Sequence, residues 1–324
     1  MRGASKWLVI VVLALGALGL VSGHTPDTDV ADMRAKYTNE SSRFIEVEPG
    51  LVLHVRDEGN RDGSVLLLLH GSNASLQTWE PWTESLGEKY RVVTLDLPGH
   101  GLTGPDPGRD YRYARYTQVV ESAVRKLELE RFAIGGNSMG GGVAWNYALA
   151  HPDKLTALIL VSTSGMPDWQ AKKAPIGFRI ARMPVVRDIA ELITPRRMIE
   201  SSLDTSIGKK AILDDAMVDR YWELLRFPGN RRATLDRFSI EHNSEPASEE
   251  KMARLTLPTL ILWGEEDDLI PVESAEWFHE HIPDSELRTY AHVGHILMEE
   301  VPRRSAADVD AFLSALIDPS NDRP

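Results

Sequence analysis

Short apolar runs and longer amphipathic stretches alternate along most of this chain. Val65-Leu66-Leu67-Leu68-Leu69 is continuously apolar, which is typical of a strand buried on both faces of a sheet. Residues 51–58 alternate and predict an early antiparallel strand. Further strands are predicted at residues 91–96, 131–135, 158–161, 259–263 and 288–290, and helices at 79–90, 113–130, 141–150 and 274–282. This alternation predicts a mostly parallel sheet with right-handed crossovers, whose ligands bind at the carboxyl ends of the strands.

The end of one predicted strand carries a G-x-S-x-G pattern, Gly136-Asn137-Ser138-Met139-Gly140. In a sharp turn from strand to helix, such a serine exposes its Oγ atom. Gly136 and Gly140 leave room for the neighbouring strand and helix, where a Cβ atom would clash. Ser138 is therefore the predicted nucleophile. Since serine is a weak nucleophile at neutral pH, it needs a base, an orienting acid and an anion-stabilising pocket.

The anion-stabilising pocket is predicted in the loop after the run at residues 65–69, which begins His70-Gly71-Ser72-Asn73. A turn at Gly71 brings backbone N–H groups beside the serine. We predict that the amides of Ser72 and Met139 form an oxyanion hole, with Asn73 as the alternative to Ser72. The other interpretation is a tight turn in which the histidine only packs.

Four consecutive acidic residues follow the predicted strand at 259–263, in the loop Gly264-Glu265-Glu266-Asp267-Asp268-Leu269-Ile270-Pro271. A solvated run of charges accounts for most of them. The spacing W-G-x-x-D-x-x-x-P favours Asp267 over Asp268 as the orienting acid.

The predicted base comes last in the chain. His295 follows Gly294 on a loop beyond the predicted strand at 288–290, from which a histidine can reach back to the serine. It is preferred to His292, and His279 and His281 lie in a predicted surface helix.

The order Ser138, Asp267, His295 is that of α/β-hydrolases, and it differs from the orders in trypsin-like and subtilisin-like enzymes. From about Phe44 to Leu316 the chain resembles the α/β-hydrolase superfamily. The resemblance implies an eight-stranded, doubly wound sheet with an inserted helical cap, and a Ser-His-Asp triad. The motifs that carry it are His70-Gly71, Asp96-Leu97-Pro98-Gly99-His100-Gly101, residues 136–141, Trp263-Gly264-Glu265-Glu266-Asp267 and Gly294-His295.

The elbow sequence Gly-Asn-Ser-Met-Gly-Gly is similar to that of hydrolases that cleave carbon–carbon bonds in ring-fission (meta-cleavage) products of aromatic compounds. Those enzymes usually have a glycine-rich, proline-containing loop where this chain has Ser72-Asn73-Ala74-Ser75, and a tryptophan where it has Ile296. We therefore expect a carboxylic ester hydrolase for small-to-medium apolar substrates. Carbon–carbon hydrolysis is the alternative, and a catalytically silent binding protein of the same fold is the alternative of another class.

The alternation of strands and helices stops between residues 165 and 258, where a helical pattern is broken by six prolines. We predict a helical cap at residues 166–257, inserted between core segments at 43–165 and 258–318. Its apolar side chains either line a substrate pocket or pack a small core of the cap.

The composition of the chain argues against several classes of binding partner but says little about the reaction. The apolar fraction of 42% and charged fraction of 26% are ordinary for a globular protein. A net charge of −12 disfavours nucleic acid and anionic lipid, which need clustered Lys and Arg. The absence of cysteine excludes disulfides, thiolate metal sites and acylation at Cys. No metal-ligand spacing or phosphate-binding loop is seen, so we expect neither metal nor cofactor, and a small molecule as the partner.

The N-terminus predicts export. Arg2 and Lys6 precede an apolar run at residues 7–21, and small residues follow near Gly23. The run of 15 residues is shorter than the roughly 20 of a spanning helix. Residues 1–23 are predicted to be a cleaved signal peptide or an uncleaved membrane anchor. The catalytic domain is then periplasmic or extracellular, or membrane-anchored outside the cytoplasm, and residues 24–42 are a tether.

Overall fold

A computed structural model describes residues 23–167, 183, 191–208, 212–239 and 246–317. Within these residues one eight-stranded sheet has the order β1-β2-β4-β3-β5-β6-β7-β8. The strands are β1 (Ser42–Glu48), β2 (Leu51–Gly59), β3 (Val65–Leu69), β4 (Arg91–Leu95), β5 (Phe132–Asn137), β6 (Leu155–Val161), β7 (Thr259–Gly264) and β8 (Ser285–Tyr290). The pairs β1–β2 and β2–β4 are antiparallel and the others are parallel, as expected for a mostly parallel sheet.

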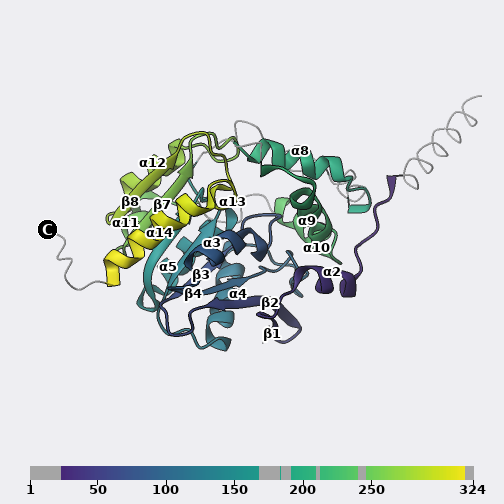
Figure 1. Ribbon diagram of the computed structural model, residues 1–324, viewed down its shortest axis with the longest axis horizontal. Coiled ribbons are helices and arrows are strands. Elements are labelled where there is room, and N and C mark those ends of the chain that lie inside the picture. Colours follow the sequence, from purple (N-terminus) through teal and green to yellow (C-terminus); the bar gives the residue numbers. More distant parts are fainter. Residues whose placement is uncertain (1–22, 168–182, 184–190, 209–211, 240–245, 318–324) are drawn as a thin grey trace, which may run out of the picture.

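Helices cover both faces of the sheet (Figure 1). Leu66 and Leu68 of β3 pack on one face and Leu67 and Leu69 on the other, which explains the continuous apolar run. The first face is covered by α3 (Glu80–Leu86), α13 (Leu297–Glu300) and α14 (Pro302–Ile317). The opposite face is covered by α4 (Tyr113–Lys126), α5 (Met139–Ala150), α11 (Glu249–Ala253) and α12 (Glu273–His281). The predicted α/β-hydrolase fold is confirmed.

Between β6 and β7 the chain forms α8 (Arg196–Ser206), α9 (Asp215–Leu225) and α10 (Asn230–Ser239), which gather at one end of the molecule (Figure 1). These three are called the inserted helices below. Their buried Ile199, Leu203 and Leu225 join the apolar cluster on the α3–α14 face, so they pack onto the core as well as onto one another. Met183 and Leu192 are exposed. Five other apolar residues of the predicted cap lie outside the described residues, namely Trp169, Ile176, Phe178, Ile180 and Ile189.

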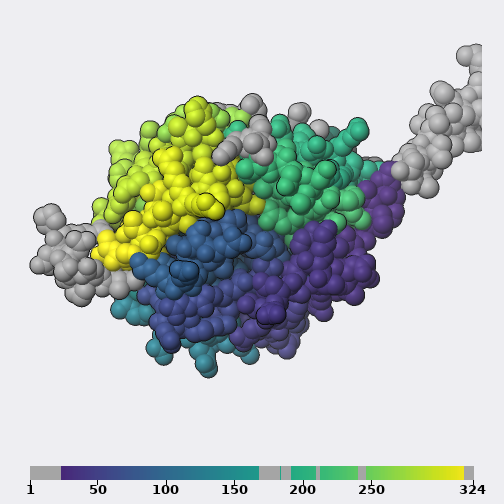
Figure 2. All heavy atoms as spheres, in the orientation of Figure 1, coloured from purple at the N-terminus to yellow at the C-terminus, as the bar shows by residue number. Residues whose placement is uncertain are grey.

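Residues 24–42 differ from the predicted tether. They contain α2 (Val30–Tyr37), which is capped by Asp29. The side chain of Asp29 accepts hydrogen bonds from two backbone amides of the first turn. Met33 and Tyr37, four residues apart, are buried against Leu102, Leu224 and Phe227. Figure 2 shows this purple segment lying against the green inserted helices. Met33 and Tyr37 are two buried side chains in an otherwise polar stretch, so the composition of this segment did not predict a packed helix.

Charged side chains add to the docking of the N-terminal segment. The buried Arg231 of α10 donates to Thr25 O and to Asp27 Oδ1, both at 2.6 Å. Arg226 Nε donates to Pro26 O at 2.9 Å. The predicted signal or anchor at residues 1–23 lies outside the described residues except for Gly23. Among the described residues, no helix has the length and apolar character needed to cross a bilayer.

Candidate active site

Ser138 lies between β5 and α5 in a backbone conformation that side chains rarely adopt, with φ 54° and ψ −117°. Hydrogen bonds on both sides hold it there. Its N–H donates to Val161 O at 2.9 Å, and its carbonyl accepts from the amides of Gly142 and Ser164, each at 3.0 Å. The turn projects the half-buried side chain beyond the carboxyl end of the sheet.

Close backbone packing explains the elbow glycines. A Cβ atom on Gly140 would lie 2.2 Å from Leu69 O, and one on Gly136 would lie 2.3 Å from the carbonyl carbon of Gly140. Gly71 approaches the serine itself, because a Cβ there would lie 3.2 Å from Ser138 Cβ. The helix that starts at Met139 can therefore lie directly against the end of β3.

Gly140→Ala is expected to lower the free energy of unfolding by about 1–3 kcal/mol, because the methyl group overlaps a backbone carbonyl that cannot rotate away. Urea unfolding of the two proteins measures this. Gly108→Ala is the control, since its Cβ meets only Asp106 Oδ2, at 3.1 Å, and the expected change is within about 0.5 kcal/mol. Equal effects of the two substitutions would contradict the steric explanation.

His295 and Asp267 form a buried pair. His295 Nδ1 lies 2.7 Å from Asp267 Oδ2, and the two residues are 6% and 1% exposed. The other carboxylate oxygen, Oδ1, accepts from the amides of Leu269 and Ile270, both at 2.9 Å. Asp267 is thereby fixed in orientation and keeps one oxygen for the imidazole. This arrangement places the proton of a neutral His295 on Nδ1 and leaves Nε2 as the acceptor.

The alternatives from the sequence lie elsewhere. His292 pairs with Glu266 at 2.9 Å, and its side chain is 90% exposed. Asp268 is half-buried, and it is the adjacent Asp267 whose carboxylate meets the imidazole of His295.

Ser138 and His295 line one cavity of about 100 Å³ at the carboxyl ends of the strands. Its wall combines the loop at residues 71–74 with side chains of α8 and α9. The inserted residues on this wall are Ile199, Ser202, Leu203, Ser206, Tyr221 and Leu225. The structure thus brings the predicted nucleophile, base and Ser72 to one place. Met139 begins α5, where the first N–H groups of a helix have no partner within the helix.

Two side chains that hold the loop carrying His295, and a third that holds the helix after it, were not predicted. Asn137 Nδ2 donates to His295 O at 3.1 Å and ties the elbow to that loop. The carboxylate of Glu300 accepts from Gly294 N at 2.9 and 3.1 Å. Glu299 of α13 accepts from Tyr221 Oη at 2.8 Å and joins α9 to the helix that directly follows that loop. The role of Asn137 could have been inferred from its position directly before Ser138. Glu299 and Glu300 are adjacent acidic residues, and nothing in the local sequence sets them apart from other acidic pairs.

His70 and His100 are buried near the loop, and their rings lie 4.9 Å apart. His70 Nδ1 donates to Gly71 O, and its Nε2 accepts from Leu97 N. Burial lowers the pKa of His70. Burial, followed by the charge of Arg237, holds the pKa of His100 well below its ordinary value. His70 thus packs as a neutral structural residue.

Stability is expected to decrease as the pH falls below about 6.5, because the unfolded chain binds protons there that the folded histidines do not. The stabilisation is complete above the ordinary histidine pKa and is lost toward the lower folded-state pKa. Each histidine contributes a slope of about 1.4 kcal/mol per pH unit. Urea unfolding at pH 7.5, 6.5 and 5.5 measures it. In His100→Asn, unfolding should take up one proton fewer, so the slope should fall by up to about 1.4 kcal/mol per pH unit. An unchanged slope would contradict the conclusion that folded His100 is neutral in this pH range.

Asp96 has a structural role. Its carboxylate accepts from the amides of Leu76 and Leu102, each at 2.8 Å, and lies 2.8 Å from His54 Nδ1. It therefore fixes the turn after β4. Among the described residues, no group of three or more acidic or histidine side chains is placed to hold a metal ion.

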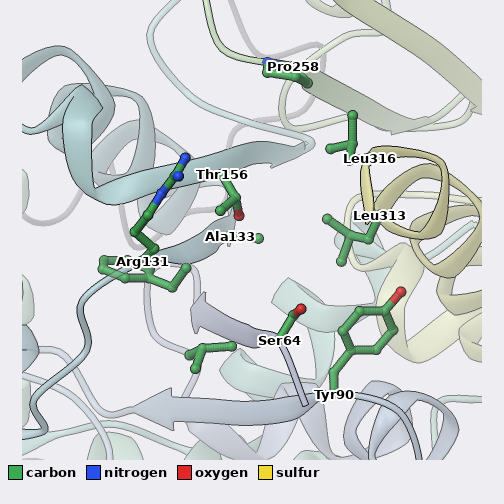
Figure 3. A pocket seen from close by; sticks show the side chains of 10 residues that line it. Ser64, Tyr90, Arg131, Ala133, Thr156, Pro258, Leu313 and Leu316 are labelled. Carbon is green, nitrogen blue, oxygen red and sulfur yellow. The ribbon is translucent and has the colours of Figure 1, made fainter. Parts of the chain in front are cut away.

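A second cavity, of about 500 Å³, lies at the opposite ends of the strands (Figure 3). It is lined by Ser64, Arg131, Thr156 and Pro258 at the amino ends of strands, and by Leu313 and Leu316 of α14. No predicted site residue lies there. Because ligands of parallel sheets bind at the carboxyl ends, the smaller cavity beside Ser138 is the candidate active site.

Comparison with known proteins gives a consistent picture. A family model described as the alpha/beta hydrolase fold matches residues 64–302. A 2-hydroxy-6-oxononadienedioate/2-hydroxy-6-oxononatrienedioate hydrolase of a Pseudomonas species is 26% identical, over 79% of this chain and 90% of that protein. Lipase 3 of a Moraxella strain is 28% identical, over 80% of each chain. The crystal structure of a membrane phospholipase A, 24% identical, superposes with a TM-score of 0.75 over 98% of this chain and 99% of that one, which shows a common fold.

Proposed function

The chain belongs to the alpha/beta hydrolase fold family, and we propose that it is a serine hydrolase that cleaves carboxylic esters through an acyl-enzyme. One observation carries the proposal. Ser138, on a strained elbow, shares a cavity with His295, whose Nδ1 is held 2.7 Å from the buried carboxylate of Asp267. This is the combination of nucleophile, base and orienting acid that acyl transfer needs.

In the proposed mechanism, Ser138 Oγ attacks the carbonyl carbon of the ester while His295 Nε2 takes the hydroxyl proton. Asp267 holds the imidazole tautomer and stabilises the imidazolium. The amides of Met139 and Ser72 stabilise the oxyanion. Collapse of the tetrahedral intermediate expels the alcohol, which receives the proton from His295. Water, deprotonated by the same histidine, then attacks the acyl-enzyme and releases the carboxylic acid and the free serine.

The cavity wall favours a neutral substrate. Its described lining is made of apolar, amide, hydroxyl and glycine residues besides His295, and contains neither Lys nor Arg. The Pseudomonas relative is named for dicarboxylate substrates, whose carboxylates need cationic partners. A small-to-medium apolar acyl group suits a wall that includes Ile199, Leu203 and Leu225. Carbon–carbon hydrolysis remains the second candidate, favoured by the elbow sequence and by that relative.

The test is a substrate panel. 4-Nitrophenyl esters with acyl chains of two to twelve carbons are compared with 2-hydroxy-6-oxo-dienoate ring-fission products, by kcat/KM. We expect the esters to be the better substrates, with the optimum at a short or medium chain. Higher kcat/KM for the ring-fission products would replace ester hydrolysis by carbon–carbon hydrolysis. A folded protein that neither turns over a substrate nor reacts with a fluorophosphonate would instead be a binding protein.

A further inference from the structure

Arg237 of α10 reaches the loop that carries the proposed oxyanion amide. Its Nη2 atom donates to Ser72 Oγ and to Asn73 Oδ1, both at 2.9 Å. Its Nη1 atom donates to His100 Nε2 at 2.8 Å. One guanidinium group therefore joins an inserted helix to two loops at the carboxyl end of the sheet. Arg237 is not among the residues that line the cavity.

The loop that Arg237 holds has an unusual backbone. Asn73 has φ 59°, in the left-handed region, which costs a non-glycine residue free energy. Two side chains of α10 donate to Asn73 Oδ1, because Thr234 Oγ1 lies 3.1 Å from it in addition to Arg237 Nη2. The preceding Gly71 lies against Ser138. Contacts from α10 thus fix the side chain of Asn73 and, with it, the backbone of the loop.

The chemistry of the contact requires a guanidinium. Arginine presents several N–H donors in a rigid planar fork, whereas lysine offers a single point charge. His100 Nδ1 lies 3.1 Å from Pro98 O and donates to it, so its Nε2 is an acceptor for Arg237. Three acceptors on two loops are thereby satisfied by one side chain.

We infer that Arg237 is a positioning residue that sets the Ser72 amide for oxyanion stabilisation, so that α10 completes the oxyanion hole. The inference rests on the proposed ester hydrolysis. An oxyanion donor is effective only at about 2.7–3.1 Å from the developing charge, and loss of one such donor costs roughly 10²–10³ in kcat. Displacement of the loop acts on the transition state and leaves ground-state binding of a neutral ester nearly unchanged.

The test compares Arg237→Met and Arg237→Lys with Arg232→Met in full-length protein. Arg232 lies on the same helix and pairs with Asp236 and Glu191 at 3.1 and 3.3 Å, away from the loop. For Arg237→Met we expect kcat for the best ester to fall by about 10²-fold, with KM changed less than about threefold. Arg237→Lys should recover little of this activity, because its ammonium cannot satisfy the three acceptors with the geometry of the guanidinium. Arg232→Met should match the wild type.

Rates are expressed per active site titrated with a fluorophosphonate, so that loss of folded protein does not imitate a loss of kcat. Wild-type kcat in Arg237→Met, or a rise in KM with kcat unchanged, would overturn the inference. So would full activity in Arg237→Lys, because a single charge would then suffice. Failure of the proposed function is distinguished by the wild type itself, which would then hydrolyse no ester.

Discussion

Ser138→Ala is expected to lower kcat for ester hydrolysis by about a millionfold and to abolish covalent labelling by a fluorophosphonate. The elbow presents this one hydroxyl to the cavity beside His295, and alanine leaves no atom that can form the acyl-enzyme. Residual turnover should come only from substrate binding and the oxyanion amides. Stopped assays with the best ester of the panel, together with labelling followed by intact-protein mass spectrometry, measure both effects.

Ser202→Ala is the matched control for this prediction. Ser202 lines the same cavity but belongs to α8, away from the elbow. Its removal should leave labelling and kcat within a few-fold of the wild type. If Ser138→Ala were still labelled while Ser202→Ala was not, the nucleophile would be misassigned and the mechanism would fail with it.

Asp267→Asn is expected to lower kcat by about 10⁴-fold, the size of the effect for the equivalent change in serine proteases. Asp267 Oδ1 accepts two backbone amides, so the amide oxygen of an asparagine would occupy that position. Its NH₂ group would then face His295 Nδ1, now 2.7 Å from Asp267 Oδ2. This donor would force the histidine proton onto Nε2, where the base must instead accept.

Asp268→Asn tests the assignment against the neighbouring acid. It removes the same charge one position along the chain, from a half-buried side chain, and should leave kcat within a few-fold of the wild type. Measurement of kcat over pH 6–9 separates loss of the correct tautomer from a simple shift of the histidine pKa. A larger loss in Asp268→Asn than in Asp267→Asn would exchange the two roles.

The fold could be predicted from the sequence because its signals are local. Leu66, Leu67, Leu68 and Leu69 of β3 are fully buried, two on each face of the sheet, as continuous apolarity requires. The strands β5, β6 and β7 occur where runs of apolar residues predict them, whereas only the last three residues of β8 were predicted as a strand. α2 was missed because two buried side chains, Met33 and Tyr37, carry its packing within a polar stretch.

For the candidate site, the chain's own pattern determined the elbow and the order of nucleophile, acid and base. Glycines at fixed spacing are required wherever backbones approach closely, and this requirement is visible in one short segment. Pairings between distant residues required the tertiary structure. Asp267 rather than Asp268 faces His295 because of how one loop is folded. Arg237 meets Ser72 across 165 positions because α10 packs over the loop, and side-chain contacts at such separations leave no local pattern to read.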